Sequence, residues 1–267
     1  MSAPEAVPTS LDDAVAQQAE RALDKLAAAR AAVEAVIFGQ GAVVEEALAT
    51  LLSGGHGLLV GVPGLAKTKL VETLAIVLGL QNQRIQFTPD LMPSDILGSE
   101  VLDETPDHKR AFRFLQGPVF TQLLMADEIN RASPRTQSAL LQAMQEHHVT
   151  VAGQRYDLPR PFHVLATQNP LEQEGTYPLP EAQLDRFLMQ IDVAYPDRDA
   201  ERRILLDTTG DVQSKPKQAM SVEDLAQAQR LVRRLPVGET VLDAILDLVR
   251  SARPGEGDPA IMRHVAW

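Results

Sequence analysis

The sequence predicts an α/β fold with a mostly parallel central sheet and helices on both of its faces. Short apolar runs typical of buried strands alternate with segments of helical periodicity up to about residue 195, and after Pro196 the strand signals stop. A glycine-rich loop, "GVPGLAKT" at 61–68, follows the apolar run "GLLV" and precedes a helical segment. This strand–loop–helix order is the setting in which phosphate-binding loops occur.

Composition sets the broad class of protein. Of the 267 residues 45% are hydrophobic, and none is cysteine, which excludes disulfides and thiolate metal sites and fits a cytoplasmic location. The first residues lack the basic and apolar regions of a signal peptide, and no run approaches about 18 apolar residues, so we expect no membrane span. The formal net charge of −11 argues against non-specific nucleic-acid binding as the activity.

Local patterns place the expected elements of the core. Residues 1–13 are polar and proline-bearing and are expected to be disordered, whereas apolar residues return every three or four positions over 14–36 and predict a helix. Two more helices are expected at about 67–80 and 133–147, the second with a Ser-Pro entry. Strands are expected in five apolar runs: 57–60, 84–88, 121–129, 162–169 and 187–193.

Two stretches interrupt this alternation and predict inserted β-hairpins. Residues 99–116 contain strand-like runs around the turn "DETPDH", beside a short helix, and 148–158 alternates around Ala152-Gly153. Helical segments at 197–207 and 221–252 follow, joined by a polar link. We therefore expect an α/β core over 14–195 and a partial C-terminal helical lid over 196–267.

The loop at 61–68 carries the residues that phosphate binding needs, with one departure. Gly61, Lys67 and Thr68 match the usual signature, but Ala66 stands where its second glycine belongs, and we expect a helical backbone angle there that accepts the methyl. The loop and the following helix start would cradle phosphate oxygens, Lys67 would face the β- and γ-phosphates, and Thr68 would ligate magnesium. The alternative is a turn with a solvated lysine. The expected binding residues are Gly61, Val62, Pro63, Gly64, Leu65, Ala66, Lys67, Thr68 and Lys69.

Two acids end the apolar strand "LLMAD" at the same edge of the expected sheet. Asp127 would orient magnesium or its waters, and Glu128 would polarise an attacking water as general base. Alone, such a pair could equally be two solvated acids at a strand end. Following a phosphate loop about 60 residues earlier, it favours nucleotide hydrolysis.

Two further polar residues follow later elements. Asn169 closes the strand "FHVLATQN" and could hold the attacking water beside the γ-phosphate, although Asn-Pro is also a common turn pair. Arg186 ends the short helix expected in "LPEAQLDRF" (179–187). The alternative for Arg186 is a surface arginine paired with Asp185 or Glu181.

Taken together, "GVPGLAKT", "LLMADEINRA", "ATQNP", "EGTYPLPEAQLDRF" and the two hairpins resemble the MoxR family of AAA+ ATPases, from about residue 20 to the C-terminus. The resemblance implies a P-loop NTPase fold with ATP and Mg²⁺ as cofactors. It places Phe38 and Gly39 of "VIFGQ" against the adenine. It also implies that Asn169 is the sensor-1 residue and that Arg186 is the arginine finger reaching into the next subunit.

The resemblance also implies partners. Members of this family act as rings, commonly hexamers, in chaperone-like assembly or metal-cofactor insertion of client complexes, together with a von Willebrand factor A domain protein. Their lid supplies a second sensor arginine in a Gly-x-x-Pro-Arg-like stretch, for which Arg263 in "AIMRHVAW" is no match, so we expect the chain to be truncated within the lid. A slow nucleotide-gated binding module and a DNA motor of the same AAA+ branch are the competing interpretations.

Overall fold

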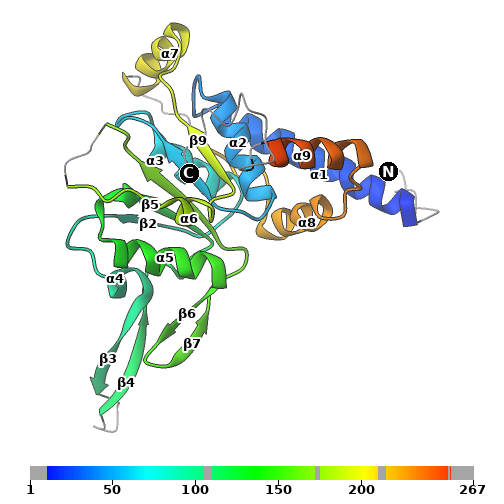
Figure 1. The fold of residues 1–267 in the computed structure, drawn as a ribbon. Coiled ribbons are helices and arrows are strands. Elements are labelled where there is room, and N and C mark those ends of the chain that lie inside the picture. The colour runs from blue at the N-terminus through cyan, green and yellow to red at the C-terminus, as the bar shows by residue number, and fades with distance from the viewer. Residues whose placement is uncertain (1–10, 105–109, 172–174, 210–214, 252, 254–267) are drawn as a thin grey trace, which may run out of the picture. The chain divides into compact units, whose positions relative to one another are not determined.

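The computed structural model describes residues 11–104, 110–171, 175–209, 215–251 and 253 (Figure 1). It divides into two compact units, residues 1–230 and 231–267. This division falls later in the chain than the expected end of the core at residue 195, which stays a prediction. Residues 1–10 and Arg263 lie outside the described residues.

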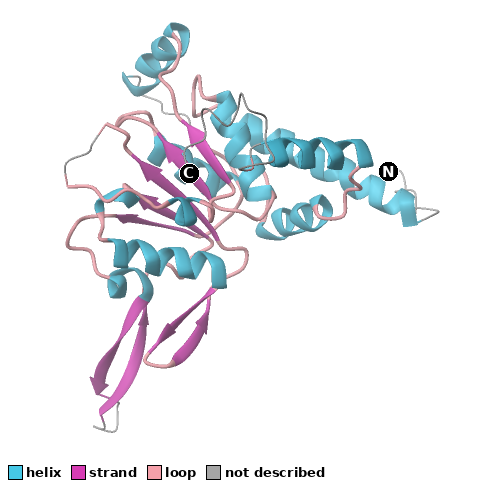
Figure 2. Cartoon of the chain, in the orientation of Figure 1, coloured by secondary structure: helices cyan, strands magenta, loops and turns pink. Residues whose placement is uncertain are grey.

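The first unit is built on a five-stranded sheet with the strand order β2-β5-β8-β1-β9 (Figure 2). All four pairings are parallel. The predicted fold class is therefore confirmed, and each expected strand is present. The strands are β1 Gly57–Val60, β2 Asn82–Gln86, β5 Leu123–Asp127, β8 His163–Gln168 and β9 Met189–Asp192.

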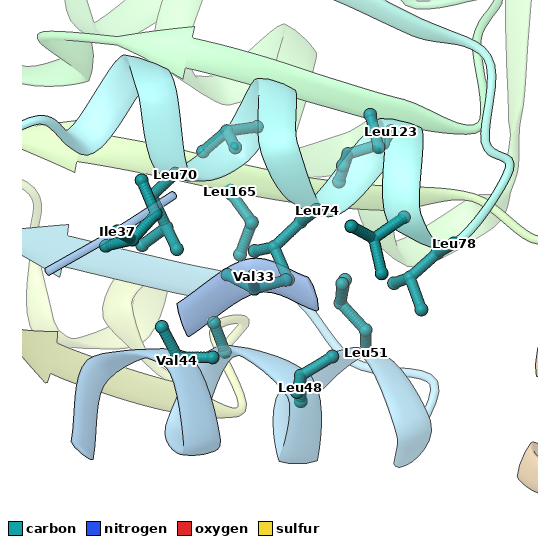
Figure 3. Close-up of a cluster of buried hydrophobic side chains, with 14 of the residues drawn as sticks. Val33, Ile37, Val44, Leu48, Leu51, Leu70, Leu74, Leu78, Leu123 and Leu165 are labelled. Carbon is teal, nitrogen blue, oxygen red and sulfur yellow. The ribbon is translucent and has the colours of Figure 1, made fainter. Parts of the chain in front are cut away.

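Consecutive strand residues point to opposite faces of the sheet, and both faces are buried. Leu59 and Leu123 join a core formed with α1 (Leu11–Glu34), α2 (Gly41–Leu52) and α3 (Lys67–Val77). Leu58 and Leu124 join a second core with α5 (Pro134–Glu146) on the other face. Figure 3 shows the first core, where Leu70 and Leu74 of α3 lie beside Val33, Val44 and Leu48 of α1 and α2. The helices thus clamp the sheet from both sides.

The helices differ from the prediction in three places. The first helix begins at Leu11 rather than at residue 14, and α2 has no counterpart among the expected elements. The pattern at 221–252 forms two helices, α8 (Val222–Val232) and α9 (Glu239–Ser251). Pro236 and Gly238 lie between them, and a proline lacks the N–H that a continuous helix needs.

Three further elements lie along the path of the first unit. These are the 3₁₀ turn η1 (Ile129–Arg131), α6 (Glu181–Leu184) and α7 (Arg198–Thr209). α7 follows the end of β9 and so begins the stretch in which the lid was expected. In the described part of the chain, no helix combines the length and apolar character needed to cross a bilayer.

Both predicted hairpins are present and extend from the same end of the α/β core (Figure 1). β3 (Gly98–Glu104) pairs with β4 (Arg110–Gln116) after the short helix α4 (Pro93–Leu97), and β6 (His148–Val151) pairs with β7 (Gln154–Asp157). Ala152 and Gly153 both have positive φ, as a two-residue hairpin turn requires. The tip of the first hairpin, 105–109, lies outside the described residues.

A buried histidine, His56, precedes β1 at the amino-terminal edge of the sheet. Its Nδ1 accepts a hydrogen bond from the Val164 N–H at 2.9 Å, so the hydrogen on Nε2 faces the Met144 carbonyl at 3.3 Å. Burial, with smaller contributions from His163 and His147, lowers the pKa of His56 to about 4. Burial also lowers the pKa of His163, whose Nδ1 lies 2.9 Å from the Gly55 carbonyl. The folded state therefore favours neutral imidazoles here.

This burial predicts an acid-sensitive fold. Unfolded His56 has an ordinary pKa near 6.5, so the unfolded chain binds more protons than the folded one between about pH 6.5 and pH 4. Stability should be fully present above this window and should fall by up to about 3 kcal/mol as the pH drops through it. Urea unfolding at several pH values measures the slope, and His56→Gln should lower stability at pH 7 but flatten the slope. A wild-type stability that is constant from pH 6.5 to 5 would contradict this account.

Candidate functional site

The phosphate loop connects β1 to α3 at the carboxyl-terminal edge of the sheet. At Gly61 a side chain would meet the Val193 carbonyl oxygen at 2.7 Å, so only glycine allows this approach to the end of β9. Gly64 has φ +85°, a left-handed angle that glycine adopts without steric cost. The loop geometry therefore requires glycine at position 61 and favours it at position 64.

Ala66 caps α3 with φ +56° and ψ +22°, in the left-handed region. The expectation of a helical angle at this position is wrong. The loop turns into the helix through a left-handed residue, which explains why the usual signature has glycine there, and an alanine in this conformation costs roughly 1–2 kcal/mol. Ala66 thus occupies the position of the signature's second glycine in a left-handed conformation, where its methyl group causes strain.

Lys67 is half-buried and folds back over its own loop. Its ammonium donates hydrogen bonds to the carbonyl oxygens of Gly61 at 2.6 Å and Val62 at 2.8 Å. Burial lowers the pKa of Lys67, while the nearby charges of Asp127 and Glu128 raise it. The side chain is therefore part of the loop and faces the two acids, in contrast to the solvated lysine of the alternative interpretation.

Asp127 ends β5 and is held from the strands on both sides. Its Oδ1 accepts a hydrogen bond from the Thr167 hydroxyl of β8 at 2.5 Å, and its Oδ2 pairs with Arg84 Nη2 of β2 at 2.6 Å. This arrangement follows from the strand order, because β5 lies between β2 and β8. Both carboxylate oxygens thus have a fixed direction.

Glu128 follows in a left-handed conformation, with φ +54°. Its N–H donates to the Thr167 hydroxyl at 2.8 Å, and its Oε2 accepts from Gln86 Nε2 at 2.7 Å and from Arg131 Nη1 at 3.0 Å. Such a backbone angle costs of order 1–3 kcal/mol in a non-glycine residue and persists where the surroundings hold it. The strained turn aims the Glu128 carboxylate along the sheet edge toward β2.

One cavity of about 430 Å³ brings these residues together. Its lining comprises residues 63–69 of the loop and helix start, with Asp127, Glu128, Thr167 and Asn169. Asn169 lies one residue beyond β8, is buried, and accepts a hydrogen bond from the Leu171 N–H at 3.2 Å. A phosphate chain placed in this cavity would face Lys67, Thr68 and both acids. The individual roles expected for these residues stay predictions.

A second, mostly apolar cavity of about 250 Å³ shares Gly64, Leu65, Ala66 and Lys69 with the first. Phe38 lines it, together with Ile204, Asp207 and Thr208 on one face of α7. Gly39 does not line it. A side chain at Gly39 would instead meet Ala200 Cβ at 2.4 Å, so this glycine lets α7 approach.

Arg186 lies apart from both cavities in its own chain. It follows α6 by two residues and lines a different cavity with His56, Met144, Gln145, Ala182 and Asp185. The structure therefore does not bring Arg186 to the phosphate loop of the same chain.

Several residues at the site were not anticipated from the sequence. Thr167, Arg84 and Gln86 contact the two acids, and the α7 residues line the apolar cavity. A weak signal existed for the strand residues. Arg84 and Gln86 are two positions apart and so share a face of β2, and Thr167 is two positions before Asn169 on the run that forms β8.

Magnesium fits the oxygen donors of the larger cavity. Thr68 and Asp127 both line it, and Mg²⁺ is typically bound by one or two carboxylates with substrate phosphates and waters. The described residues contain no group of three or more His, Cys, Asp or Glu side chains able to hold a metal. A metal at this site would take the rest of its coordination from substrate phosphates and waters.

Comparisons with known proteins agree with this geometry. The family described as "ATPase family associated with various cellular activities (AAA)" matches residues 56–189, about half of the chain, which include the loop, both acids, Asn169 and Arg186. The chain is 46% identical to Chaperone MoxR1 of Mycobacterium tuberculosis over 84% of its length. It belongs to the MoxR family of AAA+ ATPases. The uncharacterised protein YeaC of Bacillus subtilis is a further relative, 42% identical over 83% of the chain.

The chain spans only part of the length of its MoxR relatives. This MoxR-family chain spans 58% of the length of MoxR1 and 51% of Protein MoxR from Paracoccus denitrificans, which is 35% identical over 65% of the chain. The crystal structure of an ATPase candidate from Cytophaga hutchinsonii superposes with a TM-score of 0.81 and 40% identity, over 90% of this chain and 72% of that one. The P-loop NTPase fold is thus shared over most of the chain.

The strain at Ala66 predicts that glycine would stabilise this loop. In Ala66→Gly the relief of about 1–2 kcal/mol exceeds the entropy that glycine adds to the unfolded chain, about 0.4–1 kcal/mol. We expect a variant up to about 1 kcal/mol more stable in urea unfolding. The matched control is Gly64→Ala, where no atom lies within 4 Å of the added methyl but φ is +85°, and which should be less stable. Loss of stability in Ala66→Gly would argue against strain at this position.

Proposed function

We propose that this chain is a magnesium-dependent ATPase whose turnover remodels or matures a partner protein complex. The observation that carries the proposal is the single cavity in which Lys67 and Thr68 face Asp127 and Glu128. A phosphate-binding loop alone could serve a nucleotide sensor. The adjacent acids supply the two further requirements of hydrolysis, a metal ligand and a base for water.

Each residue has a role that follows from its position. Lys67 would bind the β- and γ-phosphates, and Thr68 and Asp127 would hold a magnesium ion, which would supply positive charge to the phosphate oxygens. Glu128 accepts the proton of the attacking water at its carboxylate, and Asn169 orients that water from the end of β8. The left-handed backbone at Glu128 supports this role, since strained residues cluster at active sites.

The apolar cavity supports ATP as the nucleotide. It adjoins the phosphate cavity through the shared loop residues, and its lining by Phe38, Val36 and Ile204 suits the flat face of a base. No Asn/Thr-Lys-x-Asp motif for reading guanine occurs in the sequence. Because this guanine-reading motif is absent and the family is AAA+, we assign adenine to this cavity.

Arg186 supports action as a ring. In its own chain it lines a cavity other than that of the phosphate loop, which supports the proposal that it serves the γ-phosphate of a neighbouring subunit. Such head-to-tail contacts close into a ring when the rotation permits, and a hexamer is our proposal for this chain. The printed name of the relative Chaperone MoxR1 supports a client protein complex as the target. From the motif resemblance alone, we further propose that the client is cytoplasmic, that its maturation includes metal-cofactor insertion, and that a von Willebrand factor A domain protein takes part.

A slow nucleotide-gated binding module is the second candidate. Gln86 and Arg131 both donate hydrogen bonds to Glu128 Oε2, an oxygen of the carboxylate that would act as base. These two bonds favour the binding module, because they compete with a water for that oxygen. A DNA motor is disfavoured by the net charge of −11. Measuring both ATP binding and ATP hydrolysis separates the ATPase from the binding module. The ATPase should bind and turn over ATP, whereas the binding module should bind ATP with slow or no turnover.

Two substitutions test the assignment of binding and chemistry to different residues. Lys67→Ala should abolish ATP binding, because it removes the ammonium that faces the phosphates. Glu128→Gln should keep ATP affinity and lower the hydrolysis rate by about 10²–10⁴-fold, the usual cost of losing a positioned base. Calorimetry and phosphate release measure the two effects. Wild-type turnover in Glu128→Gln would show that Glu128 is not the base.

The ring is tested by mixing two inactive variants. Arg186→Ala keeps its phosphate loop and Lys67→Ala keeps its arginine, so an interface between them can be complete although each variant alone is inactive. Random equal mixing should make about a quarter of head-to-tail contacts competent, and ATPase activity should return accordingly. Mixed oligomers that form, as seen by differently tagged subunits, but stay inactive would exclude Arg186 as the trans-acting residue.

A further inference from the structure

Thr167 contacts both acids through a single hydroxyl group. The residue is 1% exposed, and it lies on β8 beside the carboxyl end of β5. The hydroxyl donates its one hydrogen to Asp127 Oδ1 at 2.5 Å and accepts the Glu128 N–H at 2.8 Å. A threonine hydroxyl has one donor, and here that donor is committed to the carboxylate.

We propose that Thr167 is a positioning residue of the metal site, which fixes the Asp127 carboxylate for the magnesium ion and the Glu128 backbone for the chemical step. This inference rests on the proposed function. Partners that orient a metal ligand typically matter by 10–100-fold in metal affinity or activity, although they never touch the metal. Thr167 has the position of such a partner, since it lines the same cavity as Asp127 and Thr68.

The strength of this contact exceeds that of the other contact to Asp127. Arg84 also pairs with Asp127, but its side chain is 49% exposed, so solvent screens this ion pair. The hydrogen bond from Thr167 is shielded from water, and a hydrogen bond to a charged group is stronger than one between neutral groups. Thr167 is therefore the stronger constraint on the direction of the carboxylate.

The second bond of Thr167 acts on Glu128. A left-handed backbone at Glu128 persists only if its surroundings hold it, and the Thr167 oxygen holds the N–H of that residue. Because one oxygen makes both bonds, Asp127 and Glu128 keep a fixed position relative to each other. Loss of the hydroxyl should therefore change metal binding and catalysis together.

A purely structural threonine behaves differently, and the chain offers one. Thr121 is 2% exposed and donates its hydroxyl hydrogen to the Gln81 carbonyl at 2.9 Å, just before β5 and at the opposite end of that strand from Asp127. Thr121→Val removes a buried hydroxyl from the same residue type without touching the site. It is the matched control for stability effects.

The experiment measures how much magnesium tightens nucleotide binding. Calorimetry gives the Kd of a non-hydrolysable ATP analogue in the presence of Mg²⁺ and in the presence of EDTA. The Kd in EDTA divided by the Kd in Mg²⁺ reports the metal affinity of the nucleotide complex by linkage. Thr167→Val should lower this ratio by about 10–100-fold with the EDTA value unchanged. Thr167→Ser, which restores the hydroxyl, should return within a few-fold of wild type, and Thr121→Val should match wild type.

Each outcome distinguishes the inference from the proposed function. An unchanged ratio in Thr167→Val, with a clear magnesium effect in wild type, overturns the inference and leaves the proposed function standing. A wild-type ratio of one overturns the magnesium site, and the inference with it. Where Thr167→Val does not fold, Thr167→Ala and Thr167→Ser give the same comparison, and an equal ratio in Ala and Ser variants overturns the inference.

Discussion

The common direction of the five strands is the constraint on which the site depends. In a parallel sheet all carboxyl ends lie at one edge, so the loop after β1, the two acids at the end of β5 and Asn169 after β8 meet although they are far apart in the chain. One reversed strand would move its polar terminus to the opposite edge. The strand order adds a second condition, because β5 lies between β2 and β8 and its acid can therefore be held from both sides.

Strain at this edge is balanced by packing beneath it. Ala66 and Glu128 both have left-handed backbones, which cost roughly 1–2 kcal/mol at Ala66 and of order 1–3 kcal/mol at Glu128. α3 begins at the strained Ala66 and buries Leu70 and Leu74 against α1 and α2 (Figure 3). Burial of one leucine side chain contributes about 1.5–3 kcal/mol, so these two contacts alone exceed the strain at the start of the helix. The core thus holds the loop in a conformation that the loop sequence alone disfavours.

The sequence predicted what local patterns encode. The strand at 57–60 matches β1 residue for residue, and both hairpins lie where turn residues placed them. α2 was missed because only Glu45 and Glu46 are charged in its sequence, which marks its polar face weakly, although the buried Val43, Val44, Ala47, Leu48 and Leu51 recur at helical spacing. Thr167 and Arg84 were missed for another reason: their hydrogen bonds cross between strands, and strand order and register are properties of the whole sheet.

The acid pair and the Arg186 segment belong to one packed region despite lining different cavities. The Gln137 side chain of α5 is fully buried, and its amide nitrogen lies 3.2 Å from the Ile129 carbonyl oxygen, 3.1 Å from that of Ala132 and 3.0 Å from that of Tyr177. The Tyr177 N–H also donates to the Asn130 carbonyl at 2.7 Å. Each buried polar group left unpaired would cost about 1–3 kcal/mol. A displacement of η1, which directly follows Glu128, must therefore either break these bonds or carry with it the segment that leads through α6 to Arg186.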